Sequence, residues 1–414
     1  MLEPPVLLWS TRRICFAPEG PLYMTRFLKS QLLMSAVLVV GMLALPGLAF
    51  GATPYVITND DSSFPSTGVS FYSVAANGTL TLQQQVATLG VGIGGGFFGA
   101  SRIKVIDGPQ QPCVYASEAG SGSIVGISIN TLTVGGSANG SETDSGASNG
   151  MGLASNGQFL YASYGDSNTI GAFQLESGCS LNFIGDTSVT GVEGGQVNAI
   201  AAHENILIAT YTDGTIESFT ISGGVPITNG DKQISTATVQ SKDATYPNSI
   251  DITSDGHFAI FGDTSTSMVV EVSDISSGKL AKTVVQKSTA SINSSNVILS
   301  PDETLLYVIN TQGDSVSALF FNRKNGQLNP GCTSGRIRGH SVNWSYLAGP
   351  ALINQKGTGG GVYVAEFGVQ SGIAMVKINV SGKTCTLHEV SSSPFANSNS
   401  PGLLSIGAFP PRSF

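Results

Sequence analysis

One strand–turn–strand pattern recurs along this chain, and the recurrence constrains the fold more than any other feature of the sequence. The clearest copy is LSPDETLLYVINTQGDSVSAL, from Leu299 to Leu319. It reads as an apolar strand, a tight turn, a second strand, a polar loop and a third strand. The same order begins again at five further positions: Arg102, Asn149, Gln196, Asn248 and Pro350. A repeated unit of this kind must bury its apolar faces against its own copies.

The repeat has the period of a propeller blade. One large apolar residue marks the second strand of each copy, and these residues are Tyr115, Tyr161, Ile208, Ile260, Tyr307 and Tyr363. They are 46, 47, 52, 47 and 56 residues apart. Most copies then carry a short turn and a fourth strand, as in KNGQLNP and SGKTCTLHEV. Four short antiparallel strands in each repeat of about 40–50 residues predict an all-β protein built as a β-propeller.

The two ends of the repeat region predict how the ring closes. The segment TPYVITNDD begins in the middle of a blade, without a first strand before it, and SPGLLSIGAF has the pattern of an inner strand with nothing after it. Together they make one four-stranded blade, so we expect seven blades in a single domain at 53–414. Two sheets packed as a sandwich are the alternative, but they would explain neither the period nor the divided blade.

Residues 1–52 read as a leader with a secretory signal peptide. Met24, Arg26 and Lys29 precede an apolar run from Leu32 to Phe50, and small residues follow the run. This is the order of a charged, an apolar and a cleavable region. We expect translation to begin at Met24 and the exported protein to be secreted, periplasmic or part of the cell envelope. An uncleaved membrane anchor is the alternative.

The charge and the cysteines limit the partners. The formal net charge is −8, and an acidic chain without a basic run argues against nucleic acid and anionic membranes. No spacing of Cys or His indicates a metal site, and no pattern indicates a cofactor. A closed ring can stand alone, so we expect a monomer.

Four cysteines follow the leader and permit disulfides, with the pairing left open: Cys113, Cys179, Cys332 and Cys385.

The segments LSPDETLLYVIN, ASNGQFLYASY and YVITND carry a resemblance to a known family. They resemble the repeat of the lactonase-like seven-bladed propellers, which include propeller-type 6-phosphogluconolactonases and carboxymuconate cyclases, and the repeat of the related surface-layer YVTN propellers. The resemblance covers nearly all of 53–414 and rests on residues that form the fold. It implies hydrolysis of a sugar-derived or aromatic-acid lactone at the mouth of the axial channel.

Polar side chains are expected around one mouth of that channel, where the loops of all blades converge. The inner ring precedes the inner strands and consists of Arg102, Asn149, Gln196, Asn248, Ser295 and Asn296. Arg102 could hold a substrate carboxylate or phosphate, or stabilise the oxyanion of an attacked lactone. The amides Asn149, Gln196, Asn248 and Asn296 are candidate substrate contacts, and their structural alternative is to cap the strands.

An outer ring of carboxylates is expected between the second and third strands. It consists of Asp60, Asp61, Glu118, Asp166, Asp213, Asp263, Asp314 and Glu366. Such groups can activate water, bind a cation or bind sugar hydroxyls. We take Asp166 and Asp213 as candidate catalytic residues, and Glu118 and Glu366 as candidate substrate contacts. The structural alternative is that these acids stabilise turns through their own backbone.

Position favours His340 among the histidines. His203 and His257 fall in turns expected at the opposite end of the channel, and His388 falls on or beside an outer strand. His340 belongs to GRIRGHSVNWSY, a long connection that brings arginines and aromatic rings toward the expected ligand face. This segment is a candidate lid or sugar-stacking edge, with a variable surface loop as the alternative.

Two functions stay open on the sequence. The first is a lactone hydrolase, with Arg102 and His340 orienting the substrate and a rim carboxylate activating water. The second is a non-catalytic extracellular propeller that binds a glycan, an envelope polysaccharide or an envelope protein. WD-repeat scaffolds and quinone-dependent dehydrogenases are excluded, because their tryptophan motifs do not recur here.

Overall fold

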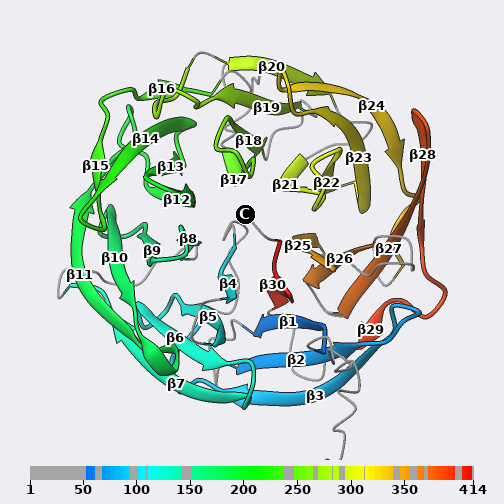
Figure 1. Ribbon diagram of the computed structural model, residues 1–414, viewed down its shortest axis with the longest axis horizontal. Coiled ribbons are helices and arrows are strands. Elements are labelled where there is room, and N and C mark those ends of the chain that lie inside the picture. Colours follow the sequence, from blue (N-terminus) through cyan, green and yellow to red (C-terminus); the bar gives the residue numbers. More distant parts are fainter. Residues whose placement is uncertain are drawn as a thin grey trace, which may run out of the picture. The chain divides into compact units, whose positions relative to one another are not determined.

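The computed structural model describes residues 53–60, 68–93, 101–107, 111–141, 151–235, 247–263, 269–281, 283–288, 294–311, 313–338, 346–353, 361–367, 372–396 and 403–412. Their strands form seven antiparallel sheets, which stand in a ring around a central axis (Figure 1). The predicted all-β, seven-bladed propeller is therefore confirmed. The ring belongs to the unit Gly51–Phe414, and the leader lies outside the described residues. Within the described ranges, no helix is long and apolar enough to span a membrane.

Each blade is named here after its innermost strand, and its strands follow one another outward from the axis. The β4 blade contains β4 (Ile103–Asp107), β5 (Pro112–Glu118), β6 (Ser123–Ser128) and β7 (Thr133–Asn139). The β8 blade contains β8 (Leu153–Ser155), β9 (Phe159–Tyr164), β10 (Thr169–Leu175), the 3-10 helix η1 (Ser177–Cys179) and β11 (Leu181–Ser188). The β12 blade contains β12 (Val197–His203), β13 (Ile206–Tyr211), β14 (Thr215–Ser222), β15 (Val225–Thr228) and the short β16 (Gln233–Ile234).

The remaining blades follow the same plan. The β17 blade contains β17 (Pro247–Ile252), β18 (Phe258–Asp263), β19 (Val269–Asp274) and β20 (Thr283–Ser288). The β21 blade contains β21 (Ser294–Leu299), β22 (Leu305–Asn310), β23 (Ser315–Asn322) and β24 (Gln327–Thr333). The β25 blade contains β25 (Tyr346–Ile353), β26 (Gly361–Phe367), β27 (Gly372–Ser381), β28 (Thr384–Glu389) and the short β29 (Phe395–Ala396). The closing blade contains β30 (Leu403–Phe409), β1 (Tyr55–Asp60), β2 (Gly68–Val74) and β3 (Leu80–Ala87).

The turn of the repeat is built by its own side chains. In the β21 blade, the Ser300 hydroxyl donates to Asp302 Oδ1 at 2.6 Å and accepts the amide of Leu305 at 3.0 Å. These bonds fix the reversal between β21 and β22, so that the following strand runs back antiparallel. The marker residues of the second strands all lie in second strands and are all buried: Tyr115, Tyr161, Ile208, Ile260, Tyr307 and Tyr363.

The closing blade joins strands from the two ends of the described chain, as predicted. β1 pairs with β2 on one side and with β30 on the other, and Ile57 lies opposite both Phe71 and Gly407. Both interactions are antiparallel ladders, so backbone hydrogen bonds close the ring. No other blade needs strands from two distant parts of the chain.

The core is divided into layers between blades. The buried apolar side chains of the described residues form seven clusters, and each cluster joins two neighbouring blades. One example joins Val56 and Tyr72 of the closing blade to Tyr363 and Ile373 of the β25 blade. A single blade cannot cover both of its faces, so the closed ring supplies the burial that each blade lacks.

Two disulfides also connect neighbouring blades. Cys113 on β5 is bonded to Cys179 in η1, and Cys332 on β24 is bonded to Cys385 on β28. All four cysteines that follow the leader are therefore used in pairs. Each bond covalently links two blades that are adjacent in the ring, and such links restrict the unfolded chain.

Candidate functional site

The inner strands give the axial channel two different ends. We call the end where the inner strands begin the entry end, and the end where they finish the exit end. The amide of Leu153, which begins β8, donates to the carbonyl of Ser101 beside the start of β4, and this marks the entry end. The last residues of β4, β8 and β12, which are Asp107, Ser155 and His203, line one cavity toward the exit end.

At the entry end, Arg102 is buried beneath the surface. Its side chain has no exposed area, and burial lowers the pKa of its guanidinium to about 9. The carbonyl of Arg102 accepts the amide of Ser117 at 2.9 Å and the side-chain amide of Asn59 at 3.4 Å. A substrate could reach this guanidinium only if the protein around it moved. The catalytic role of Arg102 stays a prediction, whereas its place in the core is a property of the fold.

The amides of the predicted inner ring bond to the entry ends of the strands. The side-chain oxygen of Asn248 accepts from the buried Asn198 at 3.1 Å, and Asn296 donates to the hydroxyl of Ser295 at 3.2 Å. For Gln196, the donor is the backbone N–H, which bonds to the Thr212 hydroxyl at 3.0 Å. Asn248 and Asn296 are both buried. These contacts match the strand-capping alternative, because each one joins polar groups near the starts of inner strands.

Two carboxylates of the predicted outer ring hold loops at the entry end. Glu118 accepts the amide of Gly90 at 3.0 Å and the hydroxyl of Ser123 at 2.6 Å. Asp213 accepts the amides of Glu193, Gly195 and Thr215 at 2.8, 3.0 and 3.0 Å. Each acid therefore organises the loop that follows the preceding blade's outer strand.

The contacts of Asp213 have an electrostatic and a steric consequence. Burial acts to raise the pKa of Asp213, but the hydrogen bonds from Thr215, Glu193 and Gly195 outweigh burial and lower that pKa. A Cβ at position 195 would lie 2.4 Å from Asp213 Cγ, so only glycine fits there. The carboxylate is fully engaged in shaping this loop.

The other predicted side chains at the entry end are dispersed. Asp166 is exposed, and Asp314 forms an ion pair with Arg336 at 2.9 Å. Arg338 forms an ion pair with Glu389 at 3.1 Å. Both arginines of the long connection, Arg336 and Arg338, therefore form ion pairs near the surface. Several predicted residues lie outside the described part of the chain, namely Asp61, Asn149 and His340, together with the side chain of Glu366.

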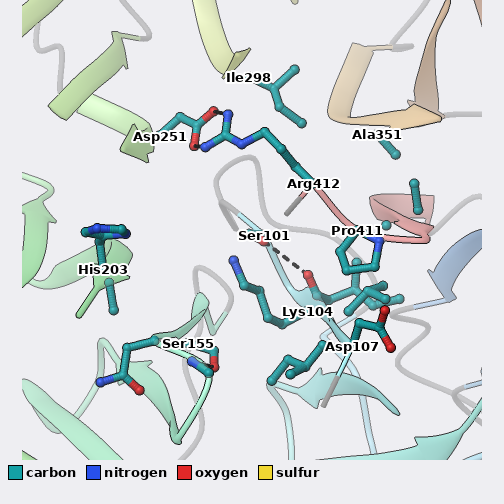
Figure 2. Close-up of a pocket in the computed structure, with 18 of the residues that line it drawn as sticks. Ser101, Lys104, Asp107, Ser155, His203, Asp251, Ile298, Ala351, Pro411 and Arg412 are labelled. Carbon is teal, nitrogen blue, oxygen red and sulfur yellow. Dashed lines mark hydrogen bonds and ion pairs between the residues drawn. The ribbon is translucent and has the colours of Figure 1, made fainter. Parts of the chain in front are cut away.

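The cavity lies along the axis and has a volume of about 650 Å³. Its lining includes every residue of β4 and Ser101 before that strand, and Ser101, Lys104 and Asp107 are labelled in Figure 2. Most of its wall is backbone and aliphatic side chain from the inner strands, including Ile298 and Ala351. A cavity of this size suits a small organic ligand, for which a few polar groups would set the orientation.

Five charged side chains line the cavity, and two of them, Asp251 and Arg412, form an ion pair. Arg412, which follows β30, reaches across the axis to Asp251 on β17 (Figure 2). Its Nη1 and Nη2 donate to the two carboxylate oxygens at 2.7 and 2.9 Å. Lys104 on β4 extends into the same cavity (Figure 2). The negative charge of Asp251 is thus balanced by the arginine, and Lys104 adds a further cationic group to the wall.

The Lys104 ammonium has a lowered pKa. Burial is the largest cause, the Asp251 carboxylate acts in the opposite direction, and the Arg412 guanidinium lowers the pKa again. The side chain is half-buried, so the amine is surrounded by protein while part of its surface faces the cavity. Such an amine donates hydrogen bonds in both protonation states, and a larger fraction of it is neutral than for a surface lysine.

His203 also lines this cavity, contrary to its exclusion on the sequence. It ends β12, its side chain is 10% exposed, and its Nε2 lies 4.0 Å from the exposed Glu204 carboxylate. Its ring packs on the turn of the β17 blade, where a Cβ at Gly256 would lie 2.8 Å from the imidazole. Gly256 has a φ of +66°, and its lack of a side chain leaves space for the imidazole ring to pack against the turn. The histidine does lie at the exit end, as predicted, and it lines the cavity there.

The sequence profile of the family "Lactonase, 7-bladed beta-propeller" matches residues 115–396, about two thirds of the chain. This chain belongs to the lactonase family of seven-bladed propellers. No curated protein matches its sequence. A candidate 6-phosphogluconolactonase from Bacteroides fragilis is 14% identical with a TM-score of 0.63, over 87% of this chain and 99% of that chain. A functionally unknown protein from Desulfotomaculum acetoxidans is 16% identical with a TM-score of 0.62, over 86% and 99%.

At these identities, the two solved structures show that the lactonase-family fold is shared, and they transfer no site residues. The repeat pattern did not indicate this cavity, because the polar residues that it aligns lie before the inner strands and in the loops between the second and third strands. The available signal was charge within an inner strand, as in IKVID for Lys104 and SIDI for Asp251. The sequence also holds one formal Gly-x-Ser-x-Gly at Gly146–Gly150, outside the described residues and between two strands rather than a strand and a helix.

Within the described ranges, no group of three or more His, Cys, Asp or Glu side chains could hold a metal ion. The polar groups that line the cavity include an amine, an imidazole, serine hydroxyls and the carboxylates of Asp107 and Glu204, beside the carboxylate that is paired with Arg412. These groups can bind a carbonyl or carboxylate oxygen and can accept a proton from water.

Proposed function

We propose that this protein is an exported lactone hydrolase that binds a small sugar-derived or aromatic-acid lactone in the axial cavity. The observation that carries the proposal is that Lys104 and His203, from the blades on either side of the β8 blade, line one cavity of about 650 Å³. Family membership supports the reaction class, and the cavity supports the size of the substrate.

Lys104 is assigned to the oxygen of the lactone carbonyl. As water adds to that carbonyl, negative charge develops on the oxygen, and a donor fixed in a poorly solvated cavity stabilises it. Arg412 neutralises Asp251, which would otherwise attract the lysine and repel the developing anion. The arginine thus offsets part of the charge of Asp251 near the lysine.

His203 is assigned to the water. A neutral imidazole accepts a proton as the water oxygen bonds to the carbonyl carbon, and the ring C–O bond then breaks. The proton passes to the leaving alkoxide, so the products are a hydroxyl group and a carboxylic acid, which ionises near neutral pH. One proton is released to solution for each lactone opened.

Export is the second part of the proposal. The leader has the composition of a secretory signal, and all four later cysteines are paired between blades. Disulfides persist in oxidising compartments and are rare in the cytosol. Both observations support a secreted or envelope location, in which the substrate would be an extracellular lactone.

The test is proton release by the purified protein on a panel of sugar and aromatic-acid lactones. Lys104→Met and His203→Gln should each lower the turnover by about 100-fold, because each removes one chemical group of the reaction. Lys324→Met is the matched control: Lys324 is exposed in the turn between β23 and β24 and does not line the cavity. Wild-type turnover that survives both cavity substitutions would overturn the assignment.

A non-catalytic binding propeller is the second candidate. It is favoured by one observation, namely that Glu118 and Asp213 are engaged in loop contacts at the entry end and do not face the cavity. If the well-folded protein opens no lactone but binds the corresponding open acids or oligosaccharides in a calorimetric titration, this function replaces the first.

A further inference from the structure

The tail Pro410–Arg412 runs from the end of β30 into the axial channel. Figure 1 shows the chain near its C-terminus at the centre of the ring. The tail leaves the closing blade, and Arg412 contacts the β17 and β21 blades on the other side of the axis. The sequence pattern gave no reason to expect anything beyond the inner strand at 403–409, so this crossing is a feature that only the structure reveals.

The groups around the Arg412 guanidinium match its donors. Nη1 and Nη2 bond to the two oxygens of Asp251, Nη2 also donates to the carbonyl of Ile252 at 2.7 Å, and Nη1 lies 3.4 Å from the carbonyl of Leu299. The side chains are 8% exposed for Arg412 and 15% for Asp251. A carboxylate and two carbonyls around the two terminal nitrogens suit the planar fork of a guanidinium better than an ammonium.

The acceptors are held in place by the blades and not by the tail. Asp251 Oδ1 accepts the amide of Ile252 at 2.9 Å, and Oδ2 accepts the amide of Leu299 at 2.7 Å. The carbonyls of Ile252 and Leu299 belong to the ends of β17 and β21. The carboxylate therefore keeps its orientation across two blades when the arginine is absent.

We propose that Asp251, with the carbonyls of Ile252 and Leu299, forms a guanidinium-binding site that the tail fills in cis and that an alkylguanidine or an arginine side chain fills in trans when Arg412 is removed. The site lies in the wall of the axial cavity, so its occupant also decides whether Asp251 is neutralised there. The inference is independent of the hydrolysis proposed above, because it concerns binding alone.

The experiment compares the full chain with its Arg412→Ala variant, using N-acetyl-arginine amide as the probe. The probe carries its only charge on the guanidinium, and N-acetyl-lysine amide at equal concentration is the control. Binding is measured by calorimetric titration and by the shift in melting temperature. Arg412→Ala should bind the arginine probe at least about 10-fold more tightly than the wild type does, because in the wild type the tail already fills the site.

A second substitution tests the acceptor. In Arg412→Ala, the further change Asp251→Asn should weaken the arginine probe by about 10-fold or more, since it removes the charge from the bidentate pair. Equal binding of the lysine probe, equal binding by the wild type, or binding that survives Asp251→Asn would overturn the proposal. If Arg412→Ala does not fold alone, refolding is repeated with each probe: recovery with the arginine probe only supports the site, and no recovery refutes it.

Discussion

The two ends of the axial channel use polar side chains in opposite ways. At the entry end, Arg102 is buried in the fold, and Glu118 and Asp213 accept hydrogen bonds from loop amides. Lys104, near the start of β4, and His203, at the end of β12, line the axial cavity instead. The comparison teaches that a polar ring near a channel mouth is not in itself a binding site. The difference is one of place: Glu118 and Asp213 bind loop amides, whereas Lys104 and His203 line a cavity.

The largest expected effect concerns the entry end. Arg102→Ala should lower the free energy of unfolding by about 3 kcal/mol, because it empties a fully buried volume and removes the partner of surrounding groups. Denaturant unfolding followed by circular dichroism measures this change. Arg336→Ala is the control, since Arg336 is 57% exposed in a surface pair and should cost less than about 1 kcal/mol.

A different outcome for Arg102 would reverse the comparison. If Arg102→Ala kept its stability and lost its turnover on lactones, then Arg102 would act on substrate and the entry end would hold the site. If stability falls and turnover per folded molecule is kept, the guanidinium serves the fold.

A smaller effect is expected at Asp213. Asp213→Asn should cost about 1 kcal/mol at pH 7, because the amide binds the three loop N–H groups less strongly than a carboxylate does. The lowered pKa of Asp213 gives the sign: its stabilisation is complete above the ordinary aspartate pKa of about 3.9 and is lost as the pH falls through the lowered folded-state pKa. The wild type and the variant should therefore converge in acid.

Unfolding curves from pH 7 to pH 2.5 provide the measurement for Asp213. Asp166→Asn is the matched control, because Asp166 is exposed at the equivalent loop of the β8 blade. A gap between wild type and Asp213→Asn that stayed constant down to acid pH would contradict an ionised, hydrogen-bonded carboxylate.

The smallest expected effect concerns the pH dependence of labelling at the Lys104 amine, and it involves no change in stability. Because burial and Arg412 lower the pKa of Lys104, more of it is neutral at a given pH than of an exposed lysine. Amine acylation followed by mass spectrometry should reach half of its maximum at a lower pH for Lys104 than for Lys324. Identical profiles would show that the pKa of Lys104 is not lowered by the cavity. Absence of Lys104 labelling in the folded protein would show that the reagent cannot enter the cavity.

The fold was predictable because its signals are local and repeated. LSPDETLLYVIN became the last residue of β21, a side-chain-bonded turn and β22, and YVITND became β1 beside β30. Each signal depends on the alternation of apolar and polar residues and on the positions of turn-forming residues. Both properties can be read within a few positions of the sequence. Seven repetitions then left little freedom in the architecture.

The site was less predictable because it depends on the direction and depth of single side chains. A residue before an inner strand can be buried, as Arg102 is, or exposed to a channel, and the repeat does not distinguish the two. The exclusion of His203 used its position correctly but assumed that ligands bind at the entry end. Arg412 carried no signal at all, since its partner Asp251 is 161 residues away in the sequence.

Because β30 belongs to the closing blade, the ring cannot close until this strand has been synthesised. β1 has its outer neighbour β2 within a few residues of the emerging chain, but its inner edge stays open until Leu403–Phe409 leaves the ribosome. An open strand edge invites pairing with other chains, so the nascent protein carries this hazard through nearly all of its synthesis. The Cys113–Cys179 link, by contrast, can form once half of the chain has emerged, and would hold two early blades together during the delay.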